Sequence, residues 1–232
     1  MAKVVIFSGA GISAESGIST FRDSGGLWDE YDIKEICYAG CLEWNYDKTI
    51  EFYDKRRSEL KEKHPNDAHK KICALANKYP NEIAIITQNV DDMFERAGCQ
   101  KTIHLHGFLP EVRCMQCGKI KNIGYEKLAL LNKRCSCGGK FRPNIVFFAE
   151  AAPMYAVLEK ELQDCEMVVV IGTSGNVIGV NAMAAYRKAI LNNLEPSAMI
   201  EEELFDTILY KKATEAIDEI VQEVEAFLKT QK

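Results

Sequence analysis

The 232-residue sequence has no apolar run long enough to span a bilayer, and its first three residues lead into an apolar segment without signal-peptide architecture. It also has no basic excess, because 34 Asp and Glu outnumber 29 Lys and Arg and give a formal net charge of −5. Sequence-independent binding of nucleic acid needs a concentrated basic surface. Internal repeats and low-complexity tracts are absent as well. We therefore expect a cytoplasmic monomer with no membrane association and no specific nucleic-acid partner.

The sequence does contain enough apolar material for one substantial core, since 47% of its residues are hydrophobic and 27% are charged. It also contains nine cysteines. Thiols stay reduced in the cytoplasm, so we expect these cysteines to bind metal or to pack in the core rather than to form disulfides.

Apolar, β-branched runs alternate with amphipathic helical patterns along most of the chain. Runs that are apolar on both faces indicate buried parallel strands, and their alternation with helices predicts an α/β fold with a doubly wound parallel sheet. The expected strands cover residues 4–7, 83–87, 144–148 and 167–172, with a weaker candidate at 188–192. The expected helices cover residues 66–78, 154–162 and 214–228, the last with Thr214 as its N-cap.

A glycine-rich stretch, GAGISAESGISTFR at residues 9–22, follows the first expected strand almost directly. Gly9, Gly11 and Ala14 fit the G-x-G-x-x-A form of a dinucleotide fingerprint, in which small residues let the backbone approach a pyrophosphate at a helix N-terminus. The alternative is a plain tight turn. The acidic ribose ligand that nicotinamide dehydrogenases carry about twenty residues further on has no clear counterpart. We therefore expect a dinucleotide that binds differently from one that donates hydride.

Two close cysteine pairs, Cys114-x-x-Cys117 and Cys135-x-Cys137, are separated by 17 residues, and glycines follow each pair. Four thiolates can complete a tetrahedron around zinc, which leaves no position for water, so we predict one structural zinc. The alternative is four unrelated core thiols. The other five cysteines lack such spacing and are expected to be structural: Cys37, Cys41, Cys73, Cys99 and Cys165.

Two stretches break the alternation of strands and helices and predict a smaller second domain. It would consist of a helical module at residues 31–69 and a zinc module at residues 111–142. The large, nucleotide-binding domain would then consist of residues 1–30, 70–110 and 143–232.

Polar side chains follow the strand expected at 83–87, as Gln88-Asn89-Val90-Asp91-Asp92, and two imidazoles follow as His104 and His106. The carboxyl ends of parallel strands line the ligand crevice, so these groups are expected to face the nucleotide. There an imidazole can remove a ribose hydroxyl proton. The residues alone do not choose between the two imidazoles, and residues 88–92 could equally cap a helix, with Asn89 or Asp92 bonding its N–H groups. The remaining histidines, His64 and His69, are expected to face solvent.

Together these motifs resemble those of sirtuins. The matching segments occur in that family's order and cover nearly the whole chain: GAGISAESGISTFR (9–22), TQNVDD (87–92), HLHG (104–107), the two cysteine pairs, GTS (172–174) and NLEPS (193–197). The resemblance implies a Rossmann-like large domain, a small domain with a zinc module and a helical module, and an enzyme that consumes NAD.

The family's reaction, carried over, begins when the carbonyl oxygen of an acyl-lysine in a protein attacks the anomeric carbon of the nicotinamide ribose and expels nicotinamide. His106 matches the general base that then deprotonates a ribose hydroxyl, so that the acyl group leaves as O-acyl-ADP-ribose. Asn89 and Asp91 match residues that position ribose and nicotinamide. The resemblance also implies NAD contacts from Gly9, Ala10, Gly11, Ile12, Ser13, Phe21, Arg22, Trp28, Gln88, Val90, Gly172, Thr173, Ser174, Asn193, Leu194, Glu195 and Ala213, and substrate contacts from Val146, Phe147 and Phe148.

A helix expected at residues 50–60 indicates which acyl group the enzyme removes from lysine. Tyr53 and Arg56 lie three residues apart and so share a helix face, and both Arg56 and Arg57 fall in or beside the apolar stripe. A guanidinium is costly there unless an anion meets it. Sirtuins that favour succinyl- or malonyl-lysine carry a Tyr-x-x-Arg pair at this helix, which points to Tyr53 and Arg56. The alternative is that either arginine reaches solvent or pairs with Asp54 or Glu59.

The sequence departs from the family pattern at three places. Ser19 stands where proline is usual, Ala149 replaces the glycine of a Trp-Phe-Gly-Glu segment, and residues 175–179 lack a proline. The last two segments are where sirtuins bind their peptide as an added strand, so peptide binding is less firmly predicted than NAD binding. The Cβ of Ala149 either crowds the lysine channel or forces a different backbone angle.

The function predicted from the sequence is NAD-dependent removal of succinyl, malonyl and acetyl groups from protein lysines. One alternative is mono-ADP-ribosyl transfer or NAD hydrolysis, because another nucleophile can capture the same activated ribose. A second is a zinc-containing NAD sensor without turnover.

Overall fold

The computed structural model describes residues 2–20 and 31–230. Six strands form one parallel sheet in the order β3-β2-β1-β7-β8-β9. They are β1 (Val4–Ser8), β2 (Ile83–Thr87), β3 (Thr102–His104), β7 (Met167–Ile171), β8 (Lys188–Asn193) and β9 (Thr207–Tyr210). Two strands extend to one side of β1 and the three later ones to the other, which is the strand order of a Rossmann sheet. The predicted α/β fold is confirmed.

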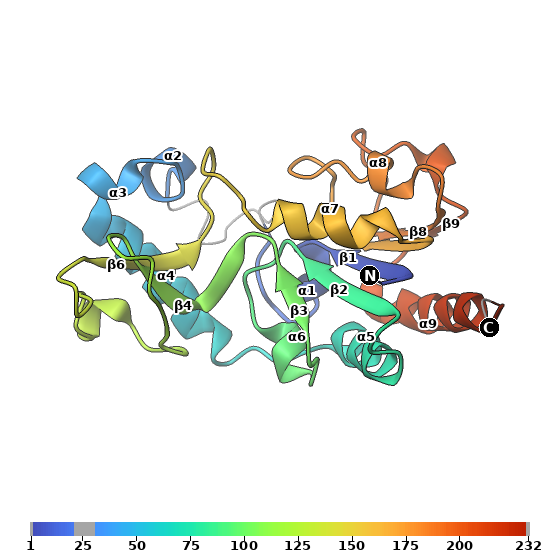
Figure 1. The fold of residues 1–232 in the computed structure, drawn as a ribbon, viewed down its shortest axis with the longest axis horizontal. Coiled ribbons are helices and arrows are strands. Elements are labelled where there is room, and N and C mark those ends of the chain that lie inside the picture. Colours follow the sequence, from blue (N-terminus) through green and yellow to red (C-terminus); the bar gives the residue numbers. More distant parts are fainter. Residues whose placement is uncertain (1, 21–30, 231–232) are drawn as a thin grey trace.

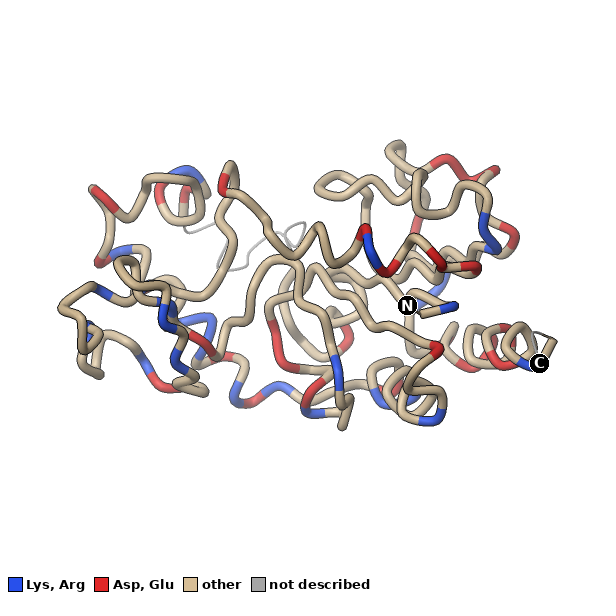
Figure 2. The backbone as a smooth tube through the Cα atoms, viewed as in Figure 1, with Lys and Arg blue, Asp and Glu red and all other residues tan. Residues whose placement is uncertain are grey.

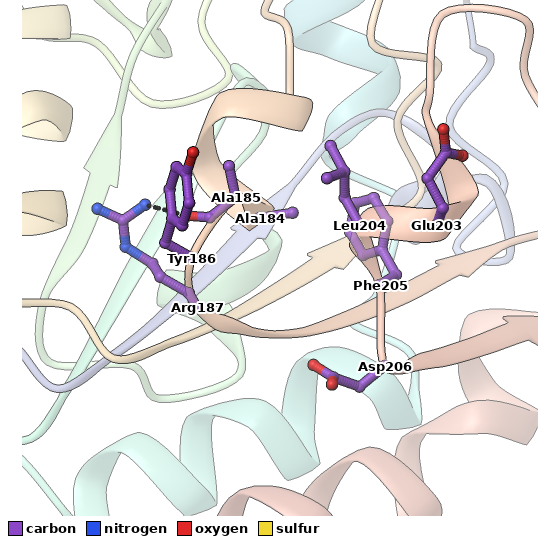
Figure 3. Close-up of a pocket in the computed structure, with 8 residues that line it drawn as sticks. All are labelled: Ala184, Ala185, Tyr186, Arg187, Glu203, Leu204, Phe205 and Asp206. Carbon is purple, nitrogen blue, oxygen red and sulfur yellow. Dashed lines mark hydrogen bonds between the residues drawn. The ribbon is translucent and has the colours of Figure 1, made fainter.

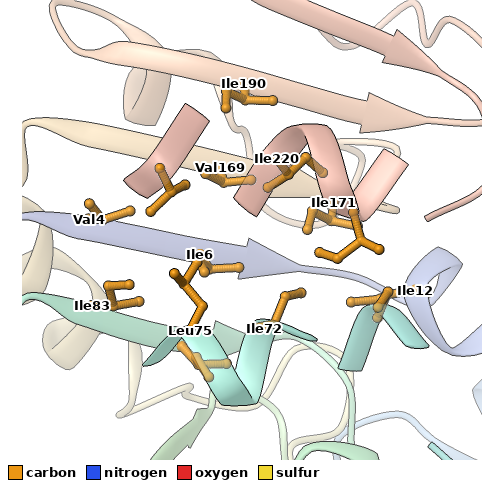
Figure 4. Close-up of a cluster of buried hydrophobic side chains, with 14 of the residues drawn as sticks. Val4, Ile6, Ile12, Ile72, Leu75, Ile83, Val169, Ile171, Ile190 and Ile220 are labelled. Atoms are coloured by element: carbon orange, nitrogen blue, oxygen red, sulfur yellow. The ribbon is translucent and has the colours of Figure 1, made fainter. Parts of the chain in front are cut away.

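Alternate side chains of the strands enter two separate cores. Val4 and Ile6 of β1 point to the face covered by α5 (Asp67–Lys78) and α9 (Ala213–Thr230) (Figures 1 and 4). Val5 and Phe7 point to the face covered by α7 (Tyr155–Gln163) and α8 (Asn181–Ala184). Because both faces of the sheet are covered, the central strands are continuous apolar runs. These runs are the reason that the strands could be predicted from the sequence.

The rest of the chain forms what we call the small lobe, at the left of Figure 1. It contains an antiparallel sheet in the order β5-β4-β6, built from β4 (Gly107–Cys114), β5 (Ile120–Asn122) and β6 (Phe141–Ile145). Packed with it are α2 (Ile33–Ile36), α3 (Cys41–Trp44), α4 (Tyr46–Leu60) and the 3-10 helix η1 (Leu128–Leu130), around a third apolar core. Two short helices, α1 (Gly11–Ala14) and α6 (Met93–Arg96), follow β1 and β2, and η2 (Glu202–Leu204) precedes β9. The domain boundaries stay a prediction.

Two predictions about elements are wrong. Residues 144–148 do not form a parallel strand of the large sheet, because residues 144 and 145 are the end of β6, which is antiparallel to β4 in the small lobe, and residues 146–148 lie beyond that strand. A short apolar run looks the same in either sheet. Thr214 is not an N-cap, because α9 already begins at Ala213; its N–H instead donates to Glu15 (3.1 Å). The edge strands β3 and β9 were not predicted, since their residues are mostly half-buried.

Cys73 and Cys99 form a disulfide, with their Cα atoms 4.8 Å apart. It joins α5 to the segment that follows α6. The expectation that all nine cysteines stay reduced is therefore wrong for this pair. That expectation rested on the reducing conditions of the cytoplasm. The two thiols, 26 residues apart in the sequence, are brought together by the packing of α5 against α6.

Lys and Arg are interspersed with Asp and Glu over most of the backbone, whereas Asp and Glu predominate along α9 (Figure 2). Within residues 2–20 and 31–230, no helix combines the length and the apolar character that crossing a membrane requires.

Candidate active site

Two glycine-bearing turns meet at the carboxyl ends of β1 and β7. The Gly11 N–H donates to the Gly172 carbonyl (2.8 Å), and the Gly9 N–H donates to the Ile171 carbonyl (2.9 Å). A Cβ on Gly9 would lie 2.7 Å from the Gly172 oxygen, and one on Gly172, whose φ is +64°, would lie 2.5 Å from the Ile12 nitrogen. The glycines thus allow the two turns to touch. This contact lies where the strand order reverses, which is where open α/β sheets bind ligands.

A buried polar network links the turn after β1 to the turn after β2. The Ser13 hydroxyl donates to Asp91 Oδ2 (2.9 Å), and the Asn89 amide donates to Ser13 Oγ and to the Gly9 carbonyl (both 3.1 Å). Asp91 Oδ1 accepts the Met93 N–H at the start of α6 (3.1 Å), and burial raises the pKa of Asp91. The helix-cap alternative is therefore correct in part, but Asp91 makes the cap bond, not Asn89 or Asp92. The same carboxylate also fixes the glycine-rich turn.

The third turn joins this network through side-chain amides. Gln88 Nε2 donates to Thr173 Oγ1 (2.9 Å), and Asn193 exchanges two hydrogen bonds with the Thr173 backbone (3.0 and 2.9 Å). Ser174 accepts a hydrogen bond at its carbonyl from the Ser197 hydroxyl (2.7 Å). The segments predicted to contact NAD at the ends of β1, β2, β7 and β8 are therefore joined to one another.

The two imidazoles, of which the resemblance chose His106, differ in their partners and in the direction of their pKa shifts. Both ring nitrogens of His104 have protein partners, the Asn89 carbonyl (2.8 Å) and Glu95 Oε1 (3.0 Å). Burial alone would lower the pKa of His104, but the hydrogen bond and charge of Glu95 raise it. His106 Nδ1 faces the Gln88 carbonyl (3.0 Å) and Nε2 faces the Tyr155 hydroxyl (2.9 Å), while burial lowers its pKa. A neutral, half-buried imidazole suits a base, so His106 is the better candidate.

His69 was expected to face solvent, and that prediction is wrong. The side chain is fully buried, its Nε2 lies 3.4 Å from Ser13 Oγ, and its ring meets Phe94 edge-on. Burial lowers the pKa of His69 to about 4. The helical pattern of α5 did not reveal this, because the contact depends on where the β1 turn lies. His64 is exposed, as expected.

The segment predicted to bind peptide, residues 146–150, is fixed at both ends. The Val146 N–H donates to the His106 carbonyl (2.9 Å), so it begins beside the candidate base. Glu150 accepts from Arg142 Nη2 (3.0 Å) and from the Phe147 N–H (2.9 Å). Phe148 pairs with Tyr38 in a single parallel bridge. Residues 147–148 therefore connect the neighbourhood of His106 with the small lobe.

Ala149, which stands where the family has glycine, has a backbone φ of +62°. The side chain is exposed, and the backbone keeps the left-handed conformation that glycine favours. We expect Ala149→Gly to raise the free energy of unfolding by about 1 kcal/mol, since glycine relieves this strain. Urea unfolding measures the change.

A matched control is Ala156→Gly, at an exposed position inside α7, which should lower stability by about the same amount. A loss of stability in both variants would contradict the strain at Ala149.

Tyr53 and Arg56 lie on α4 as expected. Tyr53 is buried, stacks on Phe147 with ring centroids 5.5 Å apart, and donates its hydroxyl to Cys37 Sγ (3.0 Å). Burial lowers the pKa of Arg56, and the nearby Tyr53 and Cys37, followed by Glu59 and Asp91, oppose that effect. The Arg56 side chain is half-buried, and its guanidinium carbon lies 5.9 Å from the centre of the Phe52 ring.

Arg57 takes the alternative role of pairing with Asp54. Its guanidinium is fully buried, Nη1 lies 2.5 Å from Asp54 Oδ1, and Nε donates to the Leu109 carbonyl (2.9 Å). Asp54 also accepts the N–H groups of Leu128 and Ala129 (both 2.8 Å). The pair joins α4, β4 and η1, so it is structural.

The four predicted zinc ligands come together. The Sγ atoms of Cys114, Cys117, Cys135 and Cys137 all lie within 4.8 Å of one another, with pair distances of 3.5 and 3.8 Å. Tetrahedral zinc with Zn–S bonds of about 2.3 Å requires sulfurs roughly 3.8 Å apart, so the cluster fits one zinc ion. Gly118 and Gly138 have φ of +72° and +89°, which supports the predicted tight turns.

The remaining predicted NAD contacts differ in exposure. Leu194 and Glu195 are exposed beyond β8, while Ala213 and Ile12 are buried in the core, where only their backbone can face a ligand. Phe21, Arg22 and Trp28 lie outside the described residues.

Of two hollows on the surface of the described residues, one borders the predicted peptide segment and the other lies apart from the predicted site. One of about 500 Å³ is lined by Tyr31, Asp32, Ile33, Lys34, Tyr38 and Phe148, and so borders the predicted peptide segment. The other, of about 410 Å³ between α8 and β9, contains no predicted site residue (Figure 3).

Comparison with known proteins gives the family. The chain belongs to the Sir2 family, which matches residues 9–179. It is 47% identical to a Campylobacter jejuni protein named NAD-dependent protein deacylase, over 99% of this chain and 98% of that one. A protein of the same name from Helicobacter hepaticus is 44% identical, over 98% and 99%. A crystal structure of a Sir2 homologue in complex with NAD has a TM-score of 0.84 at 32% identity, over 97% of this chain and 90% of that one.

Proposed function

We propose that this chain is an NAD-dependent protein-lysine deacylase that releases nicotinamide and O-acyl-ADP-ribose. The observation that carries the proposal is the position of His106 just beyond β3, where its Nδ1 faces the carbonyl of Gln88, a residue whose side-chain amide in turn bonds to Thr173 in the turn after β7. The names of relatives at 44–47% identity over nearly the full length give it independent support.

The residues have distinct roles in this proposal. The Gly9–Ser13 turn and residues 172–174 approach the phosphates, where backbone N–H groups favour an anion. Asn89 and Asp91 hold the ribose and nicotinamide in reach of an acyl-lysine carbonyl. Once that carbonyl has displaced nicotinamide, His106 accepts the proton of a ribose hydroxyl, which can then attack the acyl carbon.

The small lobe has two roles. Residues 146–148 bind the peptide through backbone hydrogen bonds as an added strand. The cysteine cluster holds one zinc ion that stabilises the lobe, because four thiolates leave no open coordination position for chemistry.

The test is a mass-spectrometric assay of purified protein with NAD and acetyl-, succinyl- or malonyl-lysine peptides. The proposal requires O-acyl-ADP-ribose that depends on both NAD and peptide. Free ADP-ribose without peptide dependence indicates an NAD hydrolase, ribosylated protein indicates a transferase, and intact NAD indicates a sensor.

We further propose that acidic acyl groups are preferred over acetyl, because α4 carries Tyr53, whose ring is buried against Phe147, and three residues further on the half-buried guanidinium of Arg56. A carboxylate at the end of the acyl chain would complete this pair. Arg56→Met is expected to lower kcat/KM for the succinyl peptide by about 10- to 100-fold, the loss of one charged hydrogen-bonded contact.

Deacetylation by the same variant should change much less, since acetyl carries no charge. The matched control is Lys61→Met at an exposed position just after α4, which should leave both rates unchanged. Equal losses on the two peptides would refute the acid-binding role of Arg56. The cytoplasmic location, the monomeric state and the lack of a nucleic-acid partner stay predictions from the sequence.

A further inference from the structure

The candidate base has a neighbour that none of the motifs indicated. Tyr155 is the first residue of α7, and its hydroxyl lies 2.9 Å from His106 Nε2. On the other side of the ring, Nδ1 lies 3.0 Å from the Gln88 carbonyl, which can only accept a hydrogen bond. Nδ1 therefore carries the ring proton, Nε2 is the acceptor, and the Tyr155 hydroxyl is the donor.

In this arrangement the Tyr155 hydroxyl occupies the only acceptor site of His106 Nε2. The unprotonated nitrogen of a neutral imidazole offers one acceptor site. A ribose hydroxyl can reach it directly only if Tyr155 moves away.

The surroundings of Tyr155 hold it in place. Its half-buried ring packs against the apolar core that contains Leu158, Phe7 and Ile86, and its N–H donates to the Ala152 carbonyl (3.1 Å) at the start of the helix. A side chain held by packing on a regular helix stays where it is more readily than one on a free loop.

We propose that Tyr155 is a further catalytic residue, which relays the ribose proton to His106; this inference rests on the proposed deacylase function. The ribose O–H bond breaks as its proton passes to Tyr155 Oη, and the Oη–H bond breaks as that proton passes to His106 Nε2. The electron pair left on the ribose oxygen forms a bond to the acyl carbon, and the π bond between that carbon and the lysine nitrogen breaks, which leaves its electron pair on the nitrogen. The phenol is regenerated, His106 becomes an imidazolium, and no further reactant is needed.

The test separates the first chemical step from the step that needs a base. Incorporation of labelled nicotinamide into NAD, in the presence of acyl peptide, reports cleavage of the glycosidic bond, which requires no base. Formation of O-acyl-ADP-ribose in a single turnover reports the proton transfer. Tyr155→Phe removes the hydroxyl and keeps the ring, and Tyr186→Phe is the matched control at a fully exposed tyrosine.

We expect Tyr155→Phe to lower O-acyl-ADP-ribose formation by about 100-fold, the usual contribution of a positioned proton-transfer group, and to change nicotinamide exchange by less than about 3-fold. Tyr186→Phe should change neither. Product formation within about 3-fold of the wild-type rate would overturn the relay, because Tyr155 would then simply be displaced. A parallel loss of exchange and product would overturn it as well, since the role would be structural.

A second measurement needs no variant. In mixtures of H₂O and D₂O, transfer of two protons in one step makes the single-turnover rate of the wild-type protein a curved function of deuterium content, whereas direct transfer to His106 gives a straight line. A straight line overturns the relay. A wild-type protein that forms no product at all would instead refute the proposed function, so the two failures are distinguishable.

Discussion

His106→Ala is expected to lower the rate of O-acyl-ADP-ribose formation by about 10²- to 10⁴-fold, the contribution of a general base. The reason is that burial lowers the pKa of His106 and its Nε2 faces the Tyr155 hydroxyl, whereas burial of His104 is outweighed by the Glu95 carboxylate, which is paired with its Nε2 and raises the pKa of His104. Nicotinamide exchange should persist, because bond cleavage comes first. Single-turnover assays measure both rates.

The matched control is His64→Ala, an exposed histidine whose Nδ1 lies 3.3 Å from Arg96. It should leave both rates unchanged. A His106→Ala variant that kept more than about a third of the wild-type product rate would show that another group is the base.

Asp54→Ala is expected to lower the free energy of unfolding by about 3–5 kcal/mol, the cost of leaving a buried charge without its partner. The side chains of Arg57 and Asp54 are 0% and 4% exposed, so water cannot replace the lost carboxylate. Burial lowers the pKa of Arg57 and Asp54 opposes that effect. The N–H groups of Leu128 and Ala129 would lose their acceptor too. Chemical unfolding of the two proteins measures the difference.

Asp47→Ala is the control on the same helix, because Asp47 is 85% exposed in its pair with Lys133. It should cost less than about 1 kcal/mol, as exposed pairs do. If Asp54→Ala cost no more than Asp47→Ala, the pair would not hold the small lobe together.

Features signalled by local sequence were predictable. The central strands are buried on both faces, so their apolar runs are unbroken, and the glycines at residues 9, 11 and 172 mark turns where a Cβ would collide with backbone. The cysteine pairs likewise show their spacing directly. In each case a short segment of sequence carries the signal, although the contact between the two glycine turns is itself long-range.

Features that depend on distant parts of the chain were not predictable in the same way. His69 and Ser13 meet across 56 residues, the Cys73–Cys99 disulfide depends on how α5 and α6 pack, and Tyr155 reaches His106 across 49 residues. The i,i+3 spacing of Asp54 and Arg57 does appear in the sequence, but it does not say that the pair is buried. The Tyr-x-x-Arg resemblance pointed to Arg56, and the packing of the small lobe shows that Arg57 is instead paired with Asp54.

The most direct measurement is a crystal structure of the protein with NAD and an acyl-lysine peptide. The account predicts the nicotinamide ribose at the carboxyl ends of β1, β2 and β7, with a ribose hydroxyl bonded to His106 Nε2 directly or through Tyr155 Oη. A His106 ring turned away from that ribose, with neither contact, would contradict it.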